Sequence, residues 1–267
     1  MRKSLIFMPV GRNLNFHEKY KNEDHWRYTK NDRCYDIILL PYDKSFVPQE
    51  GTYDILLPSM HGMKWEIVQY FLNTYDYSGY EYVGFFDDDI ITNYQSLNFA
   101  LKLAEEHHMN IFQLSLSEGS SVNEPITKKI EERNLLYTIT NYVECMCPIF
   151  HISMIPGLKE ILSYCNPWIG WTIDLIYSRC LRTHCNIIHA VSMFHTPPAP
   201  EQWLEVEPGG FILQTSYKRD AALQEAINLS DNIFPTIYKK MHNKPPPPFT
   251  LWKDPTTKLI SKVYYNG

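Results

Sequence analysis

Residues 80–90 have the sequence YEYVGFFDDDI, in which an apolar, aromatic run stops at three consecutive aspartates. Aromatic and β-branched residues favour strands, so residues 82–86 predict a buried strand. In an open α/β sheet, ligands bind outside the carboxyl ends of the strands, which is where Asp87, Asp88 and Asp89 would lie. The segment therefore predicts a central strand with a ligand site at its end.

Apolar runs and amphipathic segments alternate on both sides of this strand. Such alternation, through about residue 165, predicts an α/β layer with a largely parallel sheet. Further strands are expected at residues 4–10, 35–42, 54–58, 110–117, 142–152 and 187–194, and helices at residues 64–74, 92–104, 124–134, 157–165 and 172–183.

Residues 197–267 form a different kind of segment. The proline-rich stretches TPPAPEQW and KPPPPFTLW break regular structure, which predicts a C-terminal arm packed on the domain or on a partner. Lys and Arg outnumber Asp and Glu by 8 to 4 within residues 211–267, so this arm could also touch an anionic membrane surface. A solvated basic tail is the alternative.

The composition of the chain excludes several classes of protein. With 44% hydrophobic and 14% aromatic residues, the chain is not disordered, and its net charge of −5 argues against a nucleic-acid partner. No apolar run approaches the roughly 18 residues of a membrane span. The six scattered cysteines predict reduced thiols, and we expect a cytoplasmic protein, at most peripheral at the inner face of a membrane. A homodimer is left open.

The three adjacent acids predict a metal site. Carboxylates crowded at one strand end repel one another unless a cation lies among them, and hard oxygen ligands suit Mn²⁺ or Mg²⁺. In an extended chain Asp87 and Asp89 point the same way and Asp88 points away. The alternative is that the acids cap the helix that begins near Thr92.

Two further polar residues interrupt apolar runs. His195 directly follows the apolar stretch 187–194, and an imidazole at a strand end is an acceptable third ligand for manganese. Glu144 lies inside the apolar segment 142–152, where an unpaired buried carboxylate is costly, so it is either on the solvent face or functional.

Residues 168–174 have the sequence WIGWTID, which combines aromatic rings with an acid. Aromatic faces stack on the apolar C–H groups of sugar rings, which makes Trp171 a candidate substrate-binding residue. Asp174, at the start of the helix expected there, could accept a proton from a hydroxyl as a general base. The alternative is that Asp174 caps the helix and the tryptophans are core residues.

Two residues follow the first two expected strands. Asp43 comes after IILLPY, where its oxygens could bind a nucleotide base or ribose, and Arg12 lies just past residues 4–10, where it could meet phosphate. Together with Asp87 and Asp88, these residues are the candidates for nucleotide binding.

The ordered set of these motifs resembles the glycosyltransferase-A fold. This resemblance implies a Rossmann-like α/β catalytic domain over residues 1–196, with a mixed, mostly parallel sheet flanked by helices, and a C-terminal extension. More narrowly, the set of motifs resembles a family of glycosyltransferases from bacteria and plants that was formerly classed as a domain of unknown function. The resemblance covers roughly residues 5–196 and rests on IILLPYD at 37–43, the helix that begins with Lys64 and Trp65, YEYVGFFDDDI at 80–90, VECMCPIF at 143–150, GWTID at 170–174, and Phe194 with His195.

The resemblance implies a metal-dependent transferase that moves a sugar from a nucleoside-diphosphate sugar to a hydroxyl of a glycan or glycolipid acceptor. Asp87 and Asp89 match the metal and diphosphate motif, and Asp174 matches the acid that faces the acceptor, which implies inversion at the anomeric carbon. Glu144 matches a recurring position, and Lys64 is a further substrate-binding candidate. We favour a UDP-sugar as the donor. This chain has His189 and Ala190 where the family often has an acid.

Two other classes of function remain open from the sequence. A metal-dependent phosphoesterase could use the same carboxylates with His195 and would hydrolyse phosphate esters without any acceptor. A non-catalytic glycan-binding module would use the aromatic residues and need neither metal nor nucleotide.

Overall fold

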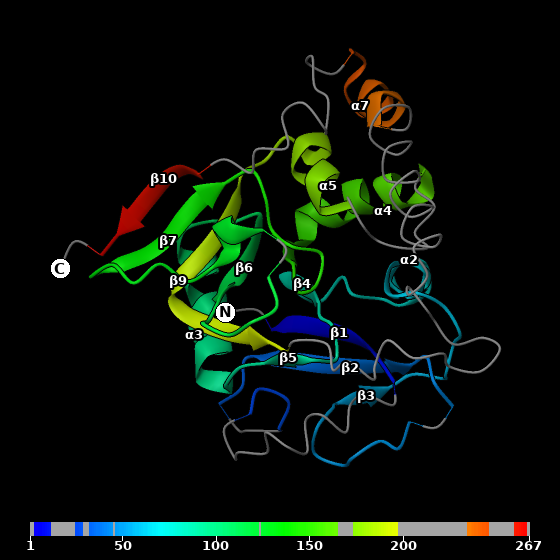
Figure 1. Cartoon of the computed structure of the whole chain (residues 1–267). Helices are drawn as coiled ribbons and strands as arrows, with labels where there is room; N and C mark the ends of the chain where they lie inside the picture. Colours follow the sequence, from blue (N-terminus) through cyan, green and yellow to red (C-terminus); the bar gives the residue numbers. More distant parts are fainter. Residues whose placement is uncertain are drawn as a thin grey trace, which may run out of the picture.

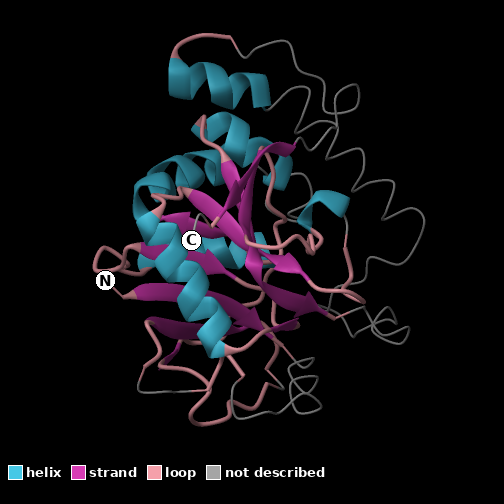
Figure 2. Ribbon diagram, turned by 90° about the vertical axis from the view of Figure 1, so that its left-hand side faces the viewer, coloured by secondary structure: helices cyan, strands magenta, loops and turns pink. Residues whose placement is uncertain are grey.

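A computed structural model describes residues 3–11, 25–28, 32–44, 46–122, 124–164, 173–196, 234–245 and 259–265. Within these ranges the chain forms a central sheet with helices outside it, as Figures 1 and 2 show. None of the helices in the described part of the chain has the length and apolar character needed to cross a bilayer.

The described strands form one sheet in the order β10-β7-β9-β6-β8-β4-β1-β2-β3, and β5 pairs with the end of β9. Every strand of this order runs in one direction except β8 and β7, which confirms the predicted mixed, mostly parallel sheet. The strands are β1 (Ser4–Val10), β2 (Tyr35–Pro41), β3 (Ile55–Leu56), β4 (Tyr82–Phe85), β5 (Ile90–Ile91), β6 (Ile111–Leu116), β7 (Leu135–Thr140), β8 (Ile149–His151), β9 (Cys185–His195) and β10 (Leu259–Tyr264).

Helices cover both faces of the sheet, because successive side chains of its buried strands point to opposite sides. Leu5 and Phe7 of β1 belong to the same core cluster as the apolar faces of α2 (Lys64–Thr74), α4 (Ile155–Tyr164), α5 (Ile173–Leu181) and α7 (Phe234–His242). Ile6 and Met8 instead share a core cluster with the apolar stripe of α3 (Tyr94–Glu106).

The elements around the apolar strands were predicted well, and α2 has the predicted bounds. The helix predicted at residues 124–134 is wrong: only the short 3-10 helix η2 (Pro125–Thr127) forms there. The amide of Lys129 donates to the carbonyl of Leu116 at 2.8 Å, so the segment runs beside the end of β6 rather than coiling.

The strand predicted at residues 142–152 is much shorter in the structure. Only β8 is extended and paired there, while residues 142–148 form a loop that follows β7. The strand β7 was not predicted. The apolar residues of the 142–148 loop are buried because the loop crosses the carboxyl end of β4, where it contributes to the site described below.

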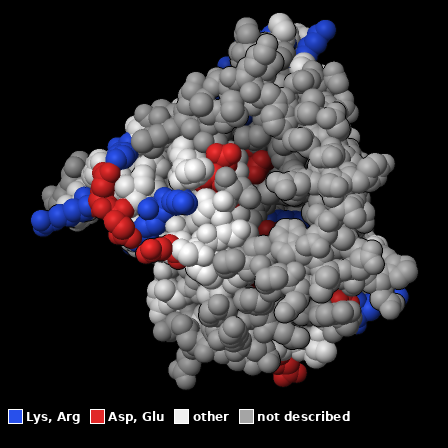
Figure 3. Space-filling view, in the orientation of Figure 1, with Lys and Arg blue, Asp and Glu red and all other residues white. Residues whose placement is uncertain are grey.

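The described parts of the C-terminal segment contact the rest of the chain at two places. β10 pairs antiparallel with β7, and the Lys262 ammonium and the Tyr264 hydroxyl both contact the Glu132 carboxylate. Figure 3 shows acidic and basic side chains side by side in this region, at the left.

The helix α7 packs on α4 and α5, and the Lys240 ammonium is paired with the Glu160 carboxylate at 2.7 Å. Residues 197–233 lie outside the described ranges.

Candidate functional site

The three acids form the short link between β4 and β5. Phe86 before them and Ile90 after them are fully buried, and the indole N–H of Trp26 donates to the carbonyl of Ile90 at 2.9 Å. The amide of Asp87 donates to the carbonyl of Met146 at 2.8 Å. The apolar anchors on both sides therefore fix the direction in which each acid points.

The alternative in which these acids cap the next helix is excluded. The N-cap of α3 is Asn93, whose side chain accepts a hydrogen bond from the amide of Ser96 at 2.7 Å, and the first turn of α3 contains no acid. The Thr92 hydroxyl instead donates to the carbonyl of Ser192 on β9 at 3.0 Å.

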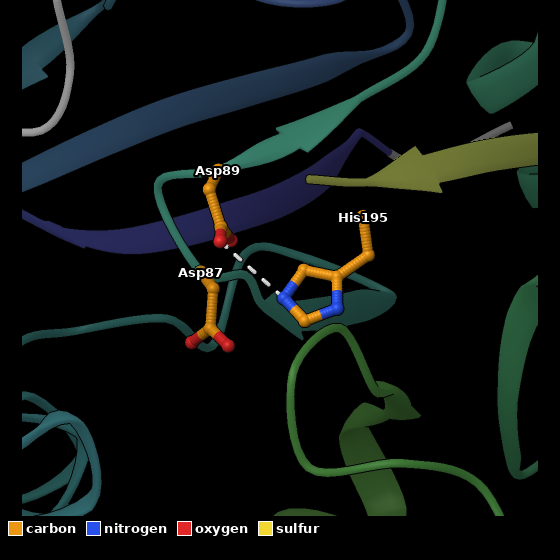
Figure 4. A group of neighbouring side chains, drawn as sticks. All are labelled: Asp87, Asp89 and His195. Atoms are coloured by element: carbon orange, nitrogen blue, oxygen red, sulfur yellow. Dashed lines mark ion pairs between the residues drawn. The ribbon is translucent and has the colours of Figure 1, made fainter. Parts of the chain in front are cut away.

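Pairing between β5 and β9 brings a histidine to the acids. Ile90 lies opposite His195 in this pairing, and ligand atoms of Asp87, Asp89 and His195 all lie within 4.8 Å of one another. Figure 4 shows the three side chains converging, with His195 Nε2 3.4 Å from Asp89 Oδ2. Within the described ranges this is the one cluster of at least three His, Cys, Asp or Glu residues with such geometry.

The orientation of the His195 ring is set from its far side. Nδ1 lies 3.0 Å from the carbonyl oxygen of Ser121, to which it donates, so Nε2 faces the carboxylates. Burial alone would lower the pKa of His195, but the hydrogen bond to Asp89 and the charges of Asp89 and Asp87 outweigh it and raise the pKa to about 9. A histidine held by a backbone carbonyl in this way is pre-oriented as a metal ligand.

The Asp89 carboxylate is only half satisfied. Its Oδ2 faces His195 and accepts a hydrogen bond from the Thr196 hydroxyl at 3.3 Å. Its Oδ1 is buried and has no hydrogen-bond partner among the residues that the structure describes. A buried carboxylate oxygen without a donor is costly, and a cation would remove that cost. Two carboxylates and one imidazole could therefore hold a metal ion here.

Asp87 has a second cationic neighbour. The Lys64 ammonium lies 2.6 Å from Asp87 Oδ1 and also donates to the carbonyls of Cys145 and Met146, each at 2.7 Å. Burial raises the pKa of the Asp87 carboxyl, and the Lys64 charge opposes this rise. In Figure 3, charged side chains of both signs are visible in a hollow of this face.

Asp88 points away from the other two acids, as predicted from the geometry of an extended chain. Its Oδ2 accepts hydrogen bonds from the Gly11 amide at 2.9 Å and the Tyr42 hydroxyl at 3.3 Å, at the ends of β1 and β2. Burial and the Asp89 charge raise the pKa of Asp88 to about 7. A side chain at Gly11 would collide with the Tyr42 ring, since an added Cβ would lie 2.2 Å from it.

Asp174 lies in the first turn of α5 and is buried, with 7% of its surface exposed. Its Oδ2 accepts hydrogen bonds from the Tyr142 hydroxyl at 3.0 Å and the Cys145 amide at 3.3 Å. Because Lys64 binds both the carbonyl of the same Cys145 and the Asp87 carboxylate, the 142–148 loop connects Asp174 with the cluster of Asp87, Asp89 and His195.

Glu144 is fully buried inside this loop rather than exposed on a solvent face. Its Oε1 accepts hydrogen bonds from the Glu124 amide at 3.1 Å and the Thr127 hydroxyl at 3.0 Å. Burial raises its pKa to about 7, and the Asp174 charge adds to this rise, while the His195 charge opposes it. Glu144 is therefore close enough to feel the charges of both His195 and Asp174.

The remaining candidates lie farther out or outside the described ranges. Asp43 is half-buried at the end of β2, beside Tyr42. Arg12 and Trp171 lie outside the described residues. Sequence analysis missed Tyr142, the hydroxyl donor to Asp174, and Arg27, a buried cation within range of Asp88. No pattern signals either residue, because both reach the site through loops.

Comparisons with known proteins give a structural likeness only. No family model matches the chain, and no curated protein matches it in sequence. Among solved structures, TarS 1–349 from S. aureus is similar over 90% of this chain and 71% of that chain, with 12% identity and a TM-score of 0.49. The complex of that fragment with UDP-GlcNAc is 12% identical, over 90% of this chain and 72% of that chain, with a TM-score of 0.49. The complex with UDP is 11% identical, over 90% of this chain and 71% of that chain, with a TM-score of 0.49.

Proposed function

We propose that this protein is a metal-dependent glycosyltransferase with a glycosyltransferase-A-like fold, which moves a sugar from a nucleoside-diphosphate sugar to a hydroxyl of a glycan or glycolipid. The observation that carries this proposal is the convergence of Asp87, Asp89 and His195 at the carboxyl end of β4, where one buried Asp89 oxygen has no hydrogen-bond partner among the described residues. That is the place where an α/β sheet binds its ligands.

The residues of the cluster would hold Mn²⁺ or Mg²⁺ through Asp87, Asp89 and the Nε2 atom of His195. When bound, such an ion stabilises the negative charge that develops on a departing diphosphate. Ser121 supports this arrangement, because its carbonyl holds a proton of His195 on Nδ1, so that Nε2 would be the nitrogen that gives up its proton and binds the ion. The apolar anchors Phe86 and Ile90 keep the two ligating acids in place.

The ends of β1 and β2 would bind the nucleotide. Asp88 lies there with Gly11 and Tyr42, and Asp43 follows β2 directly. Carboxylate oxygens at this edge suit the hydroxyls of a ribose or the N–H of a base. Arg12, which follows Gly11 in the sequence, would approach the phosphates, and a uridine nucleotide is the donor we favour.

Asp174 would act on the acceptor. A general base removes a proton from the attacking hydroxyl, and attack on the face opposite the leaving diphosphate inverts the anomeric carbon. Tyr142 and the Cys145 amide fix Oδ2 of this carboxylate, so they would orient it. Trp171 would form a wall of the acceptor site. Glu144 has no exposed surface, so it would hydrogen-bond a sugar hydroxyl only when the 142–148 loop opens.

A thermal-shift screen of nucleoside diphosphates, with and without Mn²⁺, tests the class. TarS has been crystallised with UDP-GlcNAc and UDP, so these two compounds are sensible first probes. We expect UDP with Mn²⁺ to raise the Tm more than either compound alone, and EDTA to remove the effect. Stabilisation by oligosaccharide alone would instead indicate a glycan-binding module.

An activity assay completes the test. Incubation with a UDP-sugar, Mn²⁺ and a hydroxyl acceptor should release UDP and form a glycoside, and release should stop when the metal is chelated. Release of inorganic phosphate from simple phosphate esters, with no dependence on an acceptor, would contradict the proposal and favour a phosphoesterase.

A further inference from the structure

Lys64 occupies an unfavourable place for a lysine. It is the first residue of α2, where the helix dipole is positive and favours acids such as Glu66, whose carboxylate accepts a hydrogen bond from the Met63 amide at 2.8 Å. A cation at this position does not help the helix to form. The Lys64 side chain is nevertheless mostly buried, with 16% of its surface exposed, so its contacts inside the site explain its presence.

The Lys64 ammonium has three N–H donors, and the structure provides three acceptors. These are Asp87 Oδ1 at 2.6 Å and the carbonyls of Cys145 and Met146 at 2.7 Å each. No N–H group therefore remains for an oxygen of a substrate unless one of these contacts breaks. The geometry differs from that expected of a direct ligand of the donor diphosphate.

The acceptors of Lys64 belong to both halves of the site. The Met146 carbonyl also accepts a hydrogen bond from the Asp87 amide at 2.8 Å, so the backbone and the side chain of Asp87 meet the same loop residue. The amide of Cys145 donates to Asp174 Oδ2 at 3.3 Å, while the carbonyl of Cys145 faces Lys64. One ammonium thus joins an acid of the metal cluster to the loop that holds the proposed base.

We propose that Lys64 is a positioning residue that fixes the 142–148 loop between Asp87 and Asp174, and so sets the base relative to the donor. This proposal rests on the proposed function for its kinetic consequence, but the loop contact itself can be tested without activity. It replaces direct binding of substrate by Lys64 with an indirect role.

An indirect role has a kinetic signature of its own. An ammonium beside Asp87 repels a metal ion, so its removal should not weaken metal binding. Loss of the contacts to Cys145 should instead displace Asp174, and a displacement of about 1 Å can cost up to roughly 100-fold in rate. A direct ligand of the donor would behave differently, because its loss raises the KM for the donor.

The test compares Lys64→Met with Lys102→Met, a matched change at an exposed lysine of α3. We expect Lys64→Met to lower kcat roughly 10- to 100-fold. The donor KM, and the Kd for Mn²⁺ measured by electron paramagnetic resonance, should rise by no more than about threefold over the wild type. Lys102→Met should leave all three unchanged. A raised donor KM with unchanged kcat, or no change at all, would overturn the proposal.

Hydrogen exchange tests the loop contact independently of catalysis. Amides of residues 142–147 should exchange faster in Lys64→Met than in Lys102→Met, while those of β1 and β4 stay equally protected. Equal exchange of the loop in the two variants would overturn the positioning role, even if the wild type proved to have no transferase activity. If Lys64→Met does not fold, Lys64→Gln is measured by the same criteria.

Discussion

The strand β9 carries two histidines, His189 and His195, in very different surroundings. His189 is 2% exposed, and its ring lies between the Ile130 amide, which donates to Nδ1 at 3.1 Å, and the Thr138 hydroxyl, 3.0 Å from Nε2. His195 lies six residues later at the end of the strand, between the Ser121 carbonyl and Asp89.

The surroundings of the two rings shift their pKa values in opposite directions. Burial and the charges of Lys129 and Lys262 lower the pKa of His189 to about 4, although Glu132 opposes them. His195 is half-buried, which alone would lower its pKa, yet its contact with Asp89 and the charge of Asp87 raise its pKa to about 9. A histidine that is neutral and satisfied on both sides is a packing residue, whereas one that faces two carboxylates is a ligand candidate.

Removal of the Asp89 carboxylate, which faces His195 at the end of β9, should lower turnover more than any other change. Asp89→Ala deletes the carboxylate that faces His195 and that would hold the metal, so we expect metal-dependent turnover to fall by roughly 10³-fold or more. The circular dichroism spectrum should be unchanged. Steady-state release of UDP measures the effect, and a rate like that of the wild type would remove the metal assignment.

A second change affects the base without touching the metal cluster. Asp174→Asn keeps the shape of the side chain but removes its basicity, so transfer should fall by roughly 10²-fold while binding of the donor persists. Isothermal titration with UDP and Mn²⁺ gives the binding, and glycoside formation gives the rate. If transfer survives in this variant, the base is another residue.

The two histidines can be compared directly by the same substitution. His195→Gln should weaken Mn²⁺ binding roughly 10- to 100-fold, because a ligand is lost. His189→Gln should leave Mn²⁺ binding unchanged, since His189 contacts Ile130 and Thr138 instead of the acids. Equal losses of affinity in both variants would mean that the site responds to general damage of β9.

The smallest effect concerns stability against pH. The unfolded chain protonates His189 near pH 6.5, whereas the folded chain resists protonation until about pH 4, so the contribution of His189 to stability is full above pH 6.5 and is lost as the pH falls toward 4. Relative to His189→Gln, the wild type should lose about 1–2 kcal/mol between pH 7 and pH 5.

Urea unfolding of both proteins at the two pH values measures this difference. The comparison with His189→Gln removes the contributions of other titrating groups, such as Asp88 and Glu144, which are common to the two proteins. A constant difference between the two unfolding free energies would show that His189 is not held neutral in the folded protein.

The sequence predicted the parts of the fold that depend on local pattern. The amphipathic stripe of α2 and the apolar runs of β1, β2 and β4 specify their elements directly, because each buries one continuous face or both faces. The helix predicted at residues 124–134 failed because its charged residues lie beside the end of β6, a contact between distant segments.

The same distinction applies to the candidate site. Asp87, Asp89 and His195 could be grouped from the sequence, since each follows an apolar run and the carboxyl ends of strands lie at one edge of a sheet. The contacts that join the 142–148 loop to Lys64 and, through Tyr142, to Asp174 could not be predicted, because the loop adopts no repeating pattern and its position depends on tertiary packing.

A crystal of the protein soaked with Mn²⁺ and UDP tests the central claim most directly, because manganese can be located by its anomalous scattering. We predict one strong anomalous peak within coordination distance of Asp87, Asp89 Oδ1 and His195 Nε2, with the diphosphate on its open side. A peak elsewhere, or bound UDP with no metal between the acids and the diphosphate, would contradict the account.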